Sequence, residues 1–279
     1  MLAGLPVTER RVDLAGVSTA VLEGGDGSPL VLLHGGIECG AAVWAPVVTR
    51  LAERHRVVIP DLPGLGESEP VARLDPATFA DWFTTLVRLT CDDRPAVVAQ
   101  SLGGSLAARF ATEHGDLIER LVLYGTPGVG RYRMPLGLRV TAIRFGLRPT
   151  ERNMERFEHW AFCDFDRVRG QDPEWFAAFS ADSMARARVP HVKRAMRDLI
   201  KTGTRPVSGL ERVAVPVALL WGRHDRFVPL GLAETASARL GWPLHVIDRA
   251  GHVPHIERPQ AFLSALATAV DIAAERSET

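Results

Sequence analysis

The chain has 279 residues, 46% hydrophobic and 24% charged, which predicts one large α/β domain or two small ones with a full core. No run of about 18 apolar residues occurs, which argues against a membrane-spanning helix, and the first residues do not resemble a signal peptide. Three cysteines (Cys39, Cys91 and Cys163) are far apart and lack metal-ligand spacing. We therefore expect a reduced, cytoplasmic protein without metal or cofactor.

The 33 basic and 33 acidic residues cancel over the whole chain but are unevenly distributed. Residues 127–206 contain 16 Lys and Arg against 9 Asp and Glu, so the remainder of the chain is acidic by the same margin. This basic stretch is either a solvated arginine-rich surface or a surface that attracts an anionic substrate or partner. No basic block interleaved with aromatics is present, which argues against nucleic-acid binding.

The first third of the chain alternates strand and helix patterns. Arg10 to Leu14 and Val17 to Leu22 predict a hairpin, and Leu30 to Leu33 predicts a buried strand that ends in His34-Gly35-Gly36. A helix is expected from Val43 to Glu53 and another buried strand from Arg56 to Pro60. The same alternation predicts further helices at Thr78–Thr90, Leu102–His114 and Pro259–Ala274, and further strands at Ala96–Gln100, Leu121–Tyr124, Pro216–Trp221 and Pro243–Ile247.

Continuous apolar strands separated by helices predict a mostly parallel sheet covered by helices on both faces. The alternation stops between Pro127 and Pro206, where helical patterns occur at Glu151–Phe162, Pro173–Arg186 and Pro190–Lys201. We therefore predict an α/β core formed by residues 1–126 and 207–279. A helical cap formed by residues 127–206 is expected over the carboxyl edge of the sheet, where ligands of open α/β sheets bind.

Ser101 follows Gln100 and the apolar run Val97 to Ala99, and it precedes a helix pattern. Small residues two positions on either side, Ala99 and Gly103, let a strand and a helix pack closely around a sharp turn. Such a turn exposes a serine hydroxyl as a nucleophile, although this motif usually carries glycine where this chain has Ala99. The five residues alone fit a purely structural strand-to-helix turn equally well.

Two later loops supply the partners that a serine nucleophile requires. Asp225 lies just beyond a predicted strand, and His252 follows the last strand, in the chain order serine, acid, histidine. We predict His252 as the base that accepts the Ser101 proton and Asp225 as the carboxylate that orients it. Asp248 is nearer to His252 in sequence, but at the end of its own strand it is expected to cap or to face solvent.

A tetrahedral intermediate needs two preset N–H donors. Leu102, at the start of the helix, is predicted to supply one from its backbone, and Gly36 the other, with Ile37 as the alternative. His34 is interpreted as a structural brace for this loop.

Five segments in this order resemble the α/β-hydrolase fold superfamily: His34-Gly35-Gly36, Asp61–Ser68, Ala99–Gly104, Gly222–Asp225 and Gly251-His252. The resemblance extends from about Arg10 to Ala274. It implies an eight-stranded sheet, a cap over the substrate pocket, and Ser101, Asp225 and His252 as the catalytic triad. In relatives the segment that matches Asp61–Ser68 braces the fold, so it is left outside the predicted site.

The serine nucleophile favours acyl chemistry within this superfamily, because its haloalkane dehalogenases and epoxide hydrolases use aspartate at the same turn. Hydrolysis of a carboxylic ester of a small, largely apolar molecule is the first hypothesis. The first alternative is C–C bond hydrolysis of a vinylogous diketone acid, although relatives with that activity usually carry tryptophan where this chain has Val253. The second alternative is a ligand-binding protein without turnover.

The predicted cap is rich in aromatic and thioether side chains. They either line an apolar acyl pocket or, as is expected for most of them, pack the cap helices; they are Trp160, Phe162, Phe165, Trp175, Phe176, Phe179, Met184 and Met196. Gln100, beside the nucleophile, either touches the substrate or solvates the turn.

Overall fold

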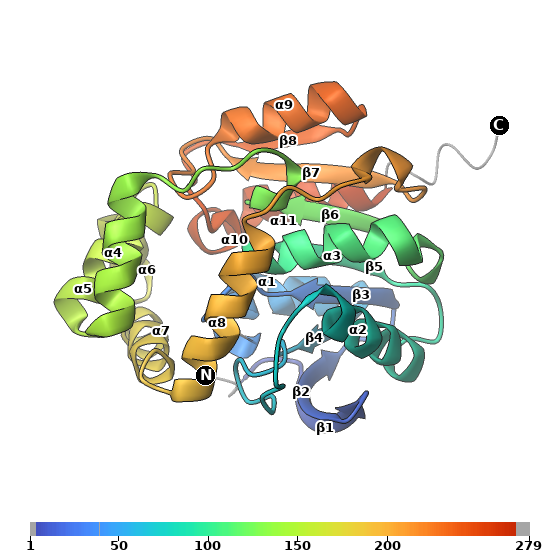
Figure 1. The fold of residues 1–279 in the computed structure, drawn as a ribbon, viewed down its shortest axis with the longest axis horizontal. Coiled ribbons are helices and arrows are strands. Elements are labelled where there is room, and N and C mark those ends of the chain that lie inside the picture. Colours follow the sequence, from blue (N-terminus) through green and yellow to red (C-terminus); the bar gives the residue numbers. More distant parts are fainter. Residues whose placement is uncertain (1–3, 39, 272–279) are drawn as a thin grey trace.

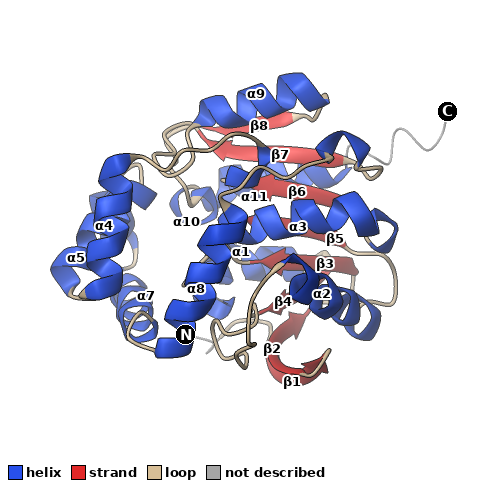
Figure 2. Ribbon diagram, in the orientation of Figure 1, coloured by secondary structure: helices blue, strands red, loops and turns tan. Residues whose placement is uncertain are grey.

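Eight strands form one sheet in the order β1-β2-β4-β3-β5-β6-β7-β8 in a computed structural model that describes residues 4–38 and 40–271 (Figures 1 and 2). β1 and β2 join antiparallel, β2 pairs antiparallel with β4, and all other neighbours are parallel. The predicted eight-stranded, mostly parallel fold is therefore confirmed. In chain order from β1 to β8, the strands are Thr8–Leu14, Val17–Gly24, Ser28–Leu33, His55–Pro60, Ala96–Gln100, Arg120–Tyr124, Val217–Gly222 and Leu244–Ile247.

Helices cover both faces of the sheet, which explains why its central strands carry runs of consecutive apolar residues. In β3, Val31 and Leu33 lie on the side of the sheet that α2 (Pro76–Thr90), α3 (Ser101–His114) and α9 (Leu230–Leu240) cover. The alternate residues Leu30 and Leu32 face α1 (Gly40–Ala52) and α11 (Pro259–Asp271) on the other side. Burial on both faces removes the alternation of apolar and polar residues that a half-exposed strand would show.

Five helices lie between β6 and β7 in the chain and stand beside the carboxyl ends of the central strands (Figure 1). These cap helices are α4 (Leu136–Leu147), α5 (Glu151–Ala161), α6 (Phe165–Gln171), α7 (Pro173–Arg186) and α8 (Pro190–Gly203). α8 packs on α3, and α4 packs on α5. The expected helices in this region are present, and the division into core and cap at residues 127 and 206 stays a prediction.

The sequence patterns missed four helices, α4, α6, α9 and the short α10 (Pro254–Glu257), and placed the start of α1 at Val43 when it begins at Gly40. α4 buries Leu138 and Phe145 yet exposes Leu136 and Leu147, so it lacks the one-sided apolar stripe that identifies a helix. The last three residues of the expected C-terminal helix, 272–274, and Cys39 lie outside the described residues. The thiols of Cys91 and Cys163 are free. Within the part of the chain described, no helix is long and apolar enough to cross a membrane.

Candidate active site

Ser101 occupies a strained turn at the point where β5 becomes α3. Its φ is +48°, a left-handed conformation that a non-glycine residue adopts at a cost of about 1–3 kcal/mol. The turn is crowded, since a Cβ on Gly35 would lie 2.6 Å from the Ser101 Cβ, and a Cβ on Gly103 would lie 2.1 Å from the His34 carbonyl oxygen. The motif thus needs its glycine at position 103 for close packing, as expected from the sequence.

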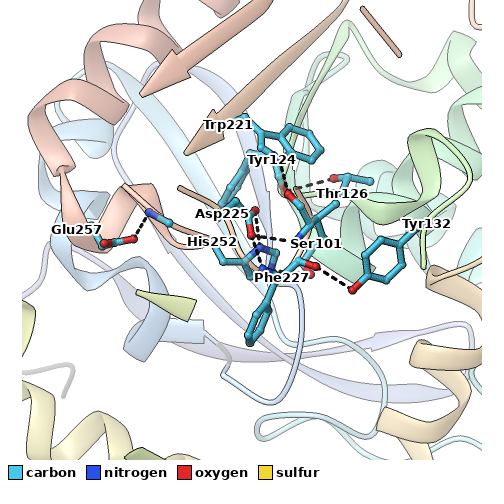
Figure 3. A network of polar contacts seen from close by, with 11 residues as sticks. Ser101, Tyr124, Thr126, Tyr132, Trp221, Asp225, Phe227, His252 and Glu257 are labelled. Atoms are coloured by element: carbon cyan, nitrogen blue, oxygen red, sulfur yellow. Dashed lines mark hydrogen bonds and ion pairs between the residues drawn. The ribbon is translucent and has the colours of Figure 1, made fainter. Parts of the chain in front are cut away.

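The loops after β7 and β8 bring Asp225 and His252 to this serine (Figure 3). The His252 Nε2 lies 3.0 Å from the Ser101 Oγ, and the His252 Nδ1 lies 2.8 Å from the Asp225 Oδ2. The other Asp225 oxygen accepts hydrogen bonds from the backbone N–H groups of Phe227 and Val228, both at 2.8 Å. With Nδ1 donating to the carboxylate, Nε2 is left to accept the serine proton.

Asp248, the alternative acid, does not join this chain of contacts. Its Oδ1 accepts a hydrogen bond from Arg223 at 2.5 Å on the exposed surface. The structure therefore brings Asp225, and not Asp248, to the imidazole. His224 is exposed beside Asp225.

Gly125, which sequence reasoning did not select, packs directly against the imidazole of His252. It follows β6 with φ +56°, and a Cβ at this position would lie 2.7 Å from the His252 Cε1 and 2.9 Å from the His252 Nδ1. Only glycine combines this backbone conformation with room for the ring. The loop after β6 therefore contributes space for the imidazole, and no reactive side chain in this loop indicates that role in the sequence.

The loop after β3 carries Gly36, the predicted second oxyanion donor. His34 Nδ1–H donates to the Gly36 carbonyl (3.1 Å) and His34 Nε2 accepts from the Leu62 N–H (2.9 Å), so the ring bridges two loops. Burial lowers the pKa of His34 to about 4, which keeps the ring neutral. His34 is thus the brace expected from the sequence. Gly36, Ile37 and Leu102 all line the cavity beside Ser101, and their role as oxyanion donors stays a prediction.

Glu257 ties the His252 loop to the cap. One of its carboxylate oxygens accepts from the Gly251 N–H (2.5 Å) and the other from the Cys163 N–H (2.7 Å), while Arg167 donates to its carbonyl oxygen (2.6 Å). The His252 N–H itself donates to the Ala161 carbonyl (2.7 Å). The position of the imidazole therefore depends on the end of α5 as well as on the sheet. Sequence reasoning missed Glu257 because nothing local marks a glutamate as buried.

A cavity of about 760 Å³ opens from Ser101 between the core and the cap helices. Three of the eight cap side chains singled out in the sequence line it: Phe162, Phe179 and Met196. Phe165, Phe176 and Trp175 instead pack against one another and their neighbours within the cap. Gln100 also lines the cavity, as do the aromatic residues Tyr132, Phe145, Phe157 and Phe227, which sequence reasoning did not select.

Two carboxyl groups, Glu38 and Glu158, interrupt the apolar lining. Glu158 on α5 is only 4% exposed, and its Oε1 accepts a hydrogen bond from the Ser180 hydroxyl at 2.6 Å. Burial raises the pKa of Glu38, and it raises the pKa of Glu158 to about 7. Among the residues that the structure describes, no group of three or more His, Cys, Asp or Glu side chains could hold a metal ion.

Glu158 makes a testable contribution to stability. Because the pKa of Glu158 in the folded protein (about 7) lies above the unfolded value (about 4.5), its stabilising contribution is complete below pH 4.5 and is lost as the pH rises through 7. A glutamine at this position stays neutral at every pH and keeps an oxygen that accepts from Ser180. We expect Glu158→Gln to be more stable than the native protein by about 1–2 kcal/mol at pH 8 and by much less at pH 5. Urea unfolding at both pH values measures the difference in stability.

Glu155→Gln, a change at an exposed residue of the same helix, is the control. A gain in stability of Glu158→Gln that does not vary with pH would contradict the raised pKa of Glu158.

The model of the alpha/beta hydrolase family matches residues 30–265, a span that includes every strand from β4 to β8 together with Ser101, Asp225 and His252. The chain belongs to this family. Relatives of similar sequence include a 2-hydroxymuconate semialdehyde hydrolase from Pseudomonas sp. strain CF600, 27% identical over 93% of this chain and 92% of that protein. Another is a pimeloyl-acyl-carrier-protein methyl ester esterase from Nitrosomonas europaea, 29% identical over 86% of this chain and 94% of the esterase.

Solved structures of this alpha/beta hydrolase fold superimpose over most of the chain. The 2-hydroxy-6-oxo-6-phenylhexa-2,4-dienoate hydrolase from Rhodococcus sp. strain RHA1 has a TM-score of 0.82 at 24% identity, covering 95% of this chain and 99% of that one. A thermophilic esterase from Thermogutta terrifontis has a TM-score of 0.77 at 22% identity, covering 94% of this chain and 98% of the esterase. These neighbours show the shared fold, and the family match supports hydrolase chemistry without choosing the bond that is cleaved.

Proposed function

We propose that this chain is a serine hydrolase that cleaves a carboxylic ester of a small, largely apolar molecule through an acyl-enzyme intermediate. The observation that carries the proposal is the line of hydrogen-bond distances from Asp225 through His252 to Ser101, which ends in a cavity lined mainly by apolar side chains. Residues 127–206 act as the lid of this cavity in the proposal.

Each proposed step uses a group in this line. The Ser101 Oγ attacks the ester carbonyl while His252 Nε2 takes its proton, and the imidazolium is stabilised by Asp225. His252 then gives that proton to the departing alkoxide, leaving an acyl group on Ser101. Water, deprotonated by His252, attacks the acyl carbon, and the proton returns to Ser101 as the acid leaves. The N–H groups of Leu102 and Gly36 are the proposed donors to the oxyanion, each typically worth about 2.7–4 kcal/mol.

The cavity lining favours a neutral ester over the diketone acid of the alternative reaction. Glu38 and Glu158 face the cavity with burial favouring their neutral forms, so they offer hydrogen bonds to a neutral substrate and no positive partner for a carboxylate. One observation favours the alternative, because Arg139, Lys193 and Arg197 also line the cavity and offer partners for a carboxylate.

Turnover of a homologous ester series separates these functions. We expect p-nitrophenyl acetate, butyrate and octanoate to be hydrolysed, with a preference for acyl chains that fill the apolar cavity, and all activity to disappear in Ser101→Ala. A meta-cleavage ring-fission product is assayed in parallel. Fast turnover of that compound with almost none of the esters would establish the C–C hydrolase, and no turnover of any of them would support ligand binding alone.

A further inference from the structure

The exposed apolar side chains of the cap gather on α4 and α8. Leu136, Val140, Ile143 and Leu147 recur at helical spacing on α4 and are 67%, 40%, 54% and 76% exposed, and Ile200 on α8 is 38% exposed. Among the described residues, the one other large aliphatic side chain with comparable exposure is Leu89, on α2. Isolated apolar residues are normal on a protein surface, but a row along one helix marks an interaction site.

The positive charge of the cap belongs to the same two helices and their flanking turns. Residues 127–150 contain five arginines and no acidic residue, and residues 187–206 contain six basic residues and one acidic residue. Residues 151–186, which form α5, α6 and α7, contain five basic and eight acidic residues. The side chains of Arg139, Arg144 and Arg148 are exposed, and the described ion pairs include none of them.

This apolar and basic surface continues into the cavity. Ile143 and Leu147 of α4 and Ile200 of α8 are exposed and at the same time line the cavity that contains Ser101. Arg139 and Lys193 do both as well. We call these exposed, cavity-lining residues of α4 and α8 the rim of the cavity; Figure 1 shows where the two helices lie in the cap. An acyl chain that enters between them passes from an apolar, positively charged surface directly to the nucleophile.

We propose that the rim formed by α4 and α8 docks on an anionic lipid surface, from which the cavity takes up acyl-chain esters. Apolar side chains that insert between head groups, flanked by arginines that neutralise anionic lipids, are the physical requirements for such binding. The proposal of docking is argued from the composition of this surface alone, whereas the uptake of an ester rests on the proposed function. This gives a role to the basic surplus of the cap, which the hydrolysis chemistry does not require.

A second copy of the chain fits this surface less well. A symmetric contact would place the same arginine-rich rim on both sides of the interface, so like charges would face each other. It would also close the entrance that Ile143, Leu147 and Ile200 flank. An anionic bilayer complements the charge and leaves the entrance facing its substrate.

Vesicle flotation of the full-length protein tests the docking surface. We expect binding to vesicles of equal parts phosphatidylglycerol and phosphatidylcholine, little binding to pure phosphatidylcholine, and release at high salt. Reversing two charges in Arg144→Glu/Arg148→Glu should lower the partition coefficient by at least about fivefold for each of the two positive charges lost. Leu136→Gln/Val140→Gln should lower it as well. None of these four residues lines the cavity.

Arg88→Glu and Leu89→Gln are the matched controls, because both residues are exposed on α2. They should bind vesicles like the native protein, and thermal unfolding establishes that every variant is folded. The proposal is overturned if the native protein binds neither vesicle, if it binds both equally, or if the cap variants bind as well as the controls. A dimer in analytical ultracentrifugation that Leu136→Gln/Val140→Gln dissociates would assign the surface to self-association instead. Vesicle binding without hydrolysis of any ester would overturn the proposed function but not the proposed docking surface.

Discussion

Replacing His252 by alanine is expected to lower kcat for ester hydrolysis by about four orders of magnitude or more, the usual effect of removing a triad member. The physical reason is that the His252 Nε2 lies 3.0 Å from the Ser101 Oγ, and no other imidazole contacts this hydroxyl in the described part of the chain. Without a base the serine stays protonated and attacks slowly. Stopped-flow or steady-state kinetics with p-nitrophenyl butyrate measures the loss.

His224→Ala is the matched control, since this histidine lies in the same loop as Asp225 but is exposed. It should retain the kcat of the native protein. Unfolding by urea separates a chemical effect from a structural one, because His252 is buried and its replacement leaves a void. A His252→Ala protein that is folded and hydrolyses esters at the native rate would show that the base lies elsewhere.

Gly125→Ala is expected to lower kcat by about a hundredfold while KM changes little. The added methyl group would lie 2.7 Å from the His252 Cε1 and 2.9 Å from its Nδ1, so the ring must move away from Ser101 or from Asp225. A displacement of about 1 Å in a catalytic group is enough for a loss of this size. The same steady-state assay measures kcat and KM separately.

Gly241→Ala separates steric displacement from backbone strain. Gly241 has φ +70°, close to the +56° of Gly125, but a Cβ there would meet nothing within 4 Å. Both variants should lose about 1 kcal/mol of stability from the left-handed backbone, and only Gly125→Ala should lose activity. If Gly125→Ala were destabilised like Gly241→Ala but fully active, the ring would not depend on the space that Gly125 leaves.

The strands and the three proposed catalytic residues were predictable because their signals are local. A fully buried parallel strand is a continuous apolar run, and the loop after it must reach the carboxyl edge of the sheet. Ser101, Asp225 and His252 each follow such a run, so their order along the chain was enough to place them at one edge.

The remaining parts of the site depend on contacts between distant segments. The contact of Glu257 with Cys163 crosses 94 positions of the chain, and Gly125 meets His252 only after β6, β7 and β8 have assembled. α4 escaped prediction for a different reason, since it is apolar on its buried and its exposed sides. The side chains that made it hard to recognise are those that form the proposed lipid-docking rim.

Fluorophosphonate labelling followed by mass spectrometry of the digested protein tests the central claim, that Ser101 is an activated nucleophile. The native protein is predicted to gain a single adduct on the peptide that contains Ser101, and Ser101→Ala is predicted to gain none. An unlabelled native protein, or an adduct that persists in Ser101→Ala, would show that Ser101 is not the activated nucleophile.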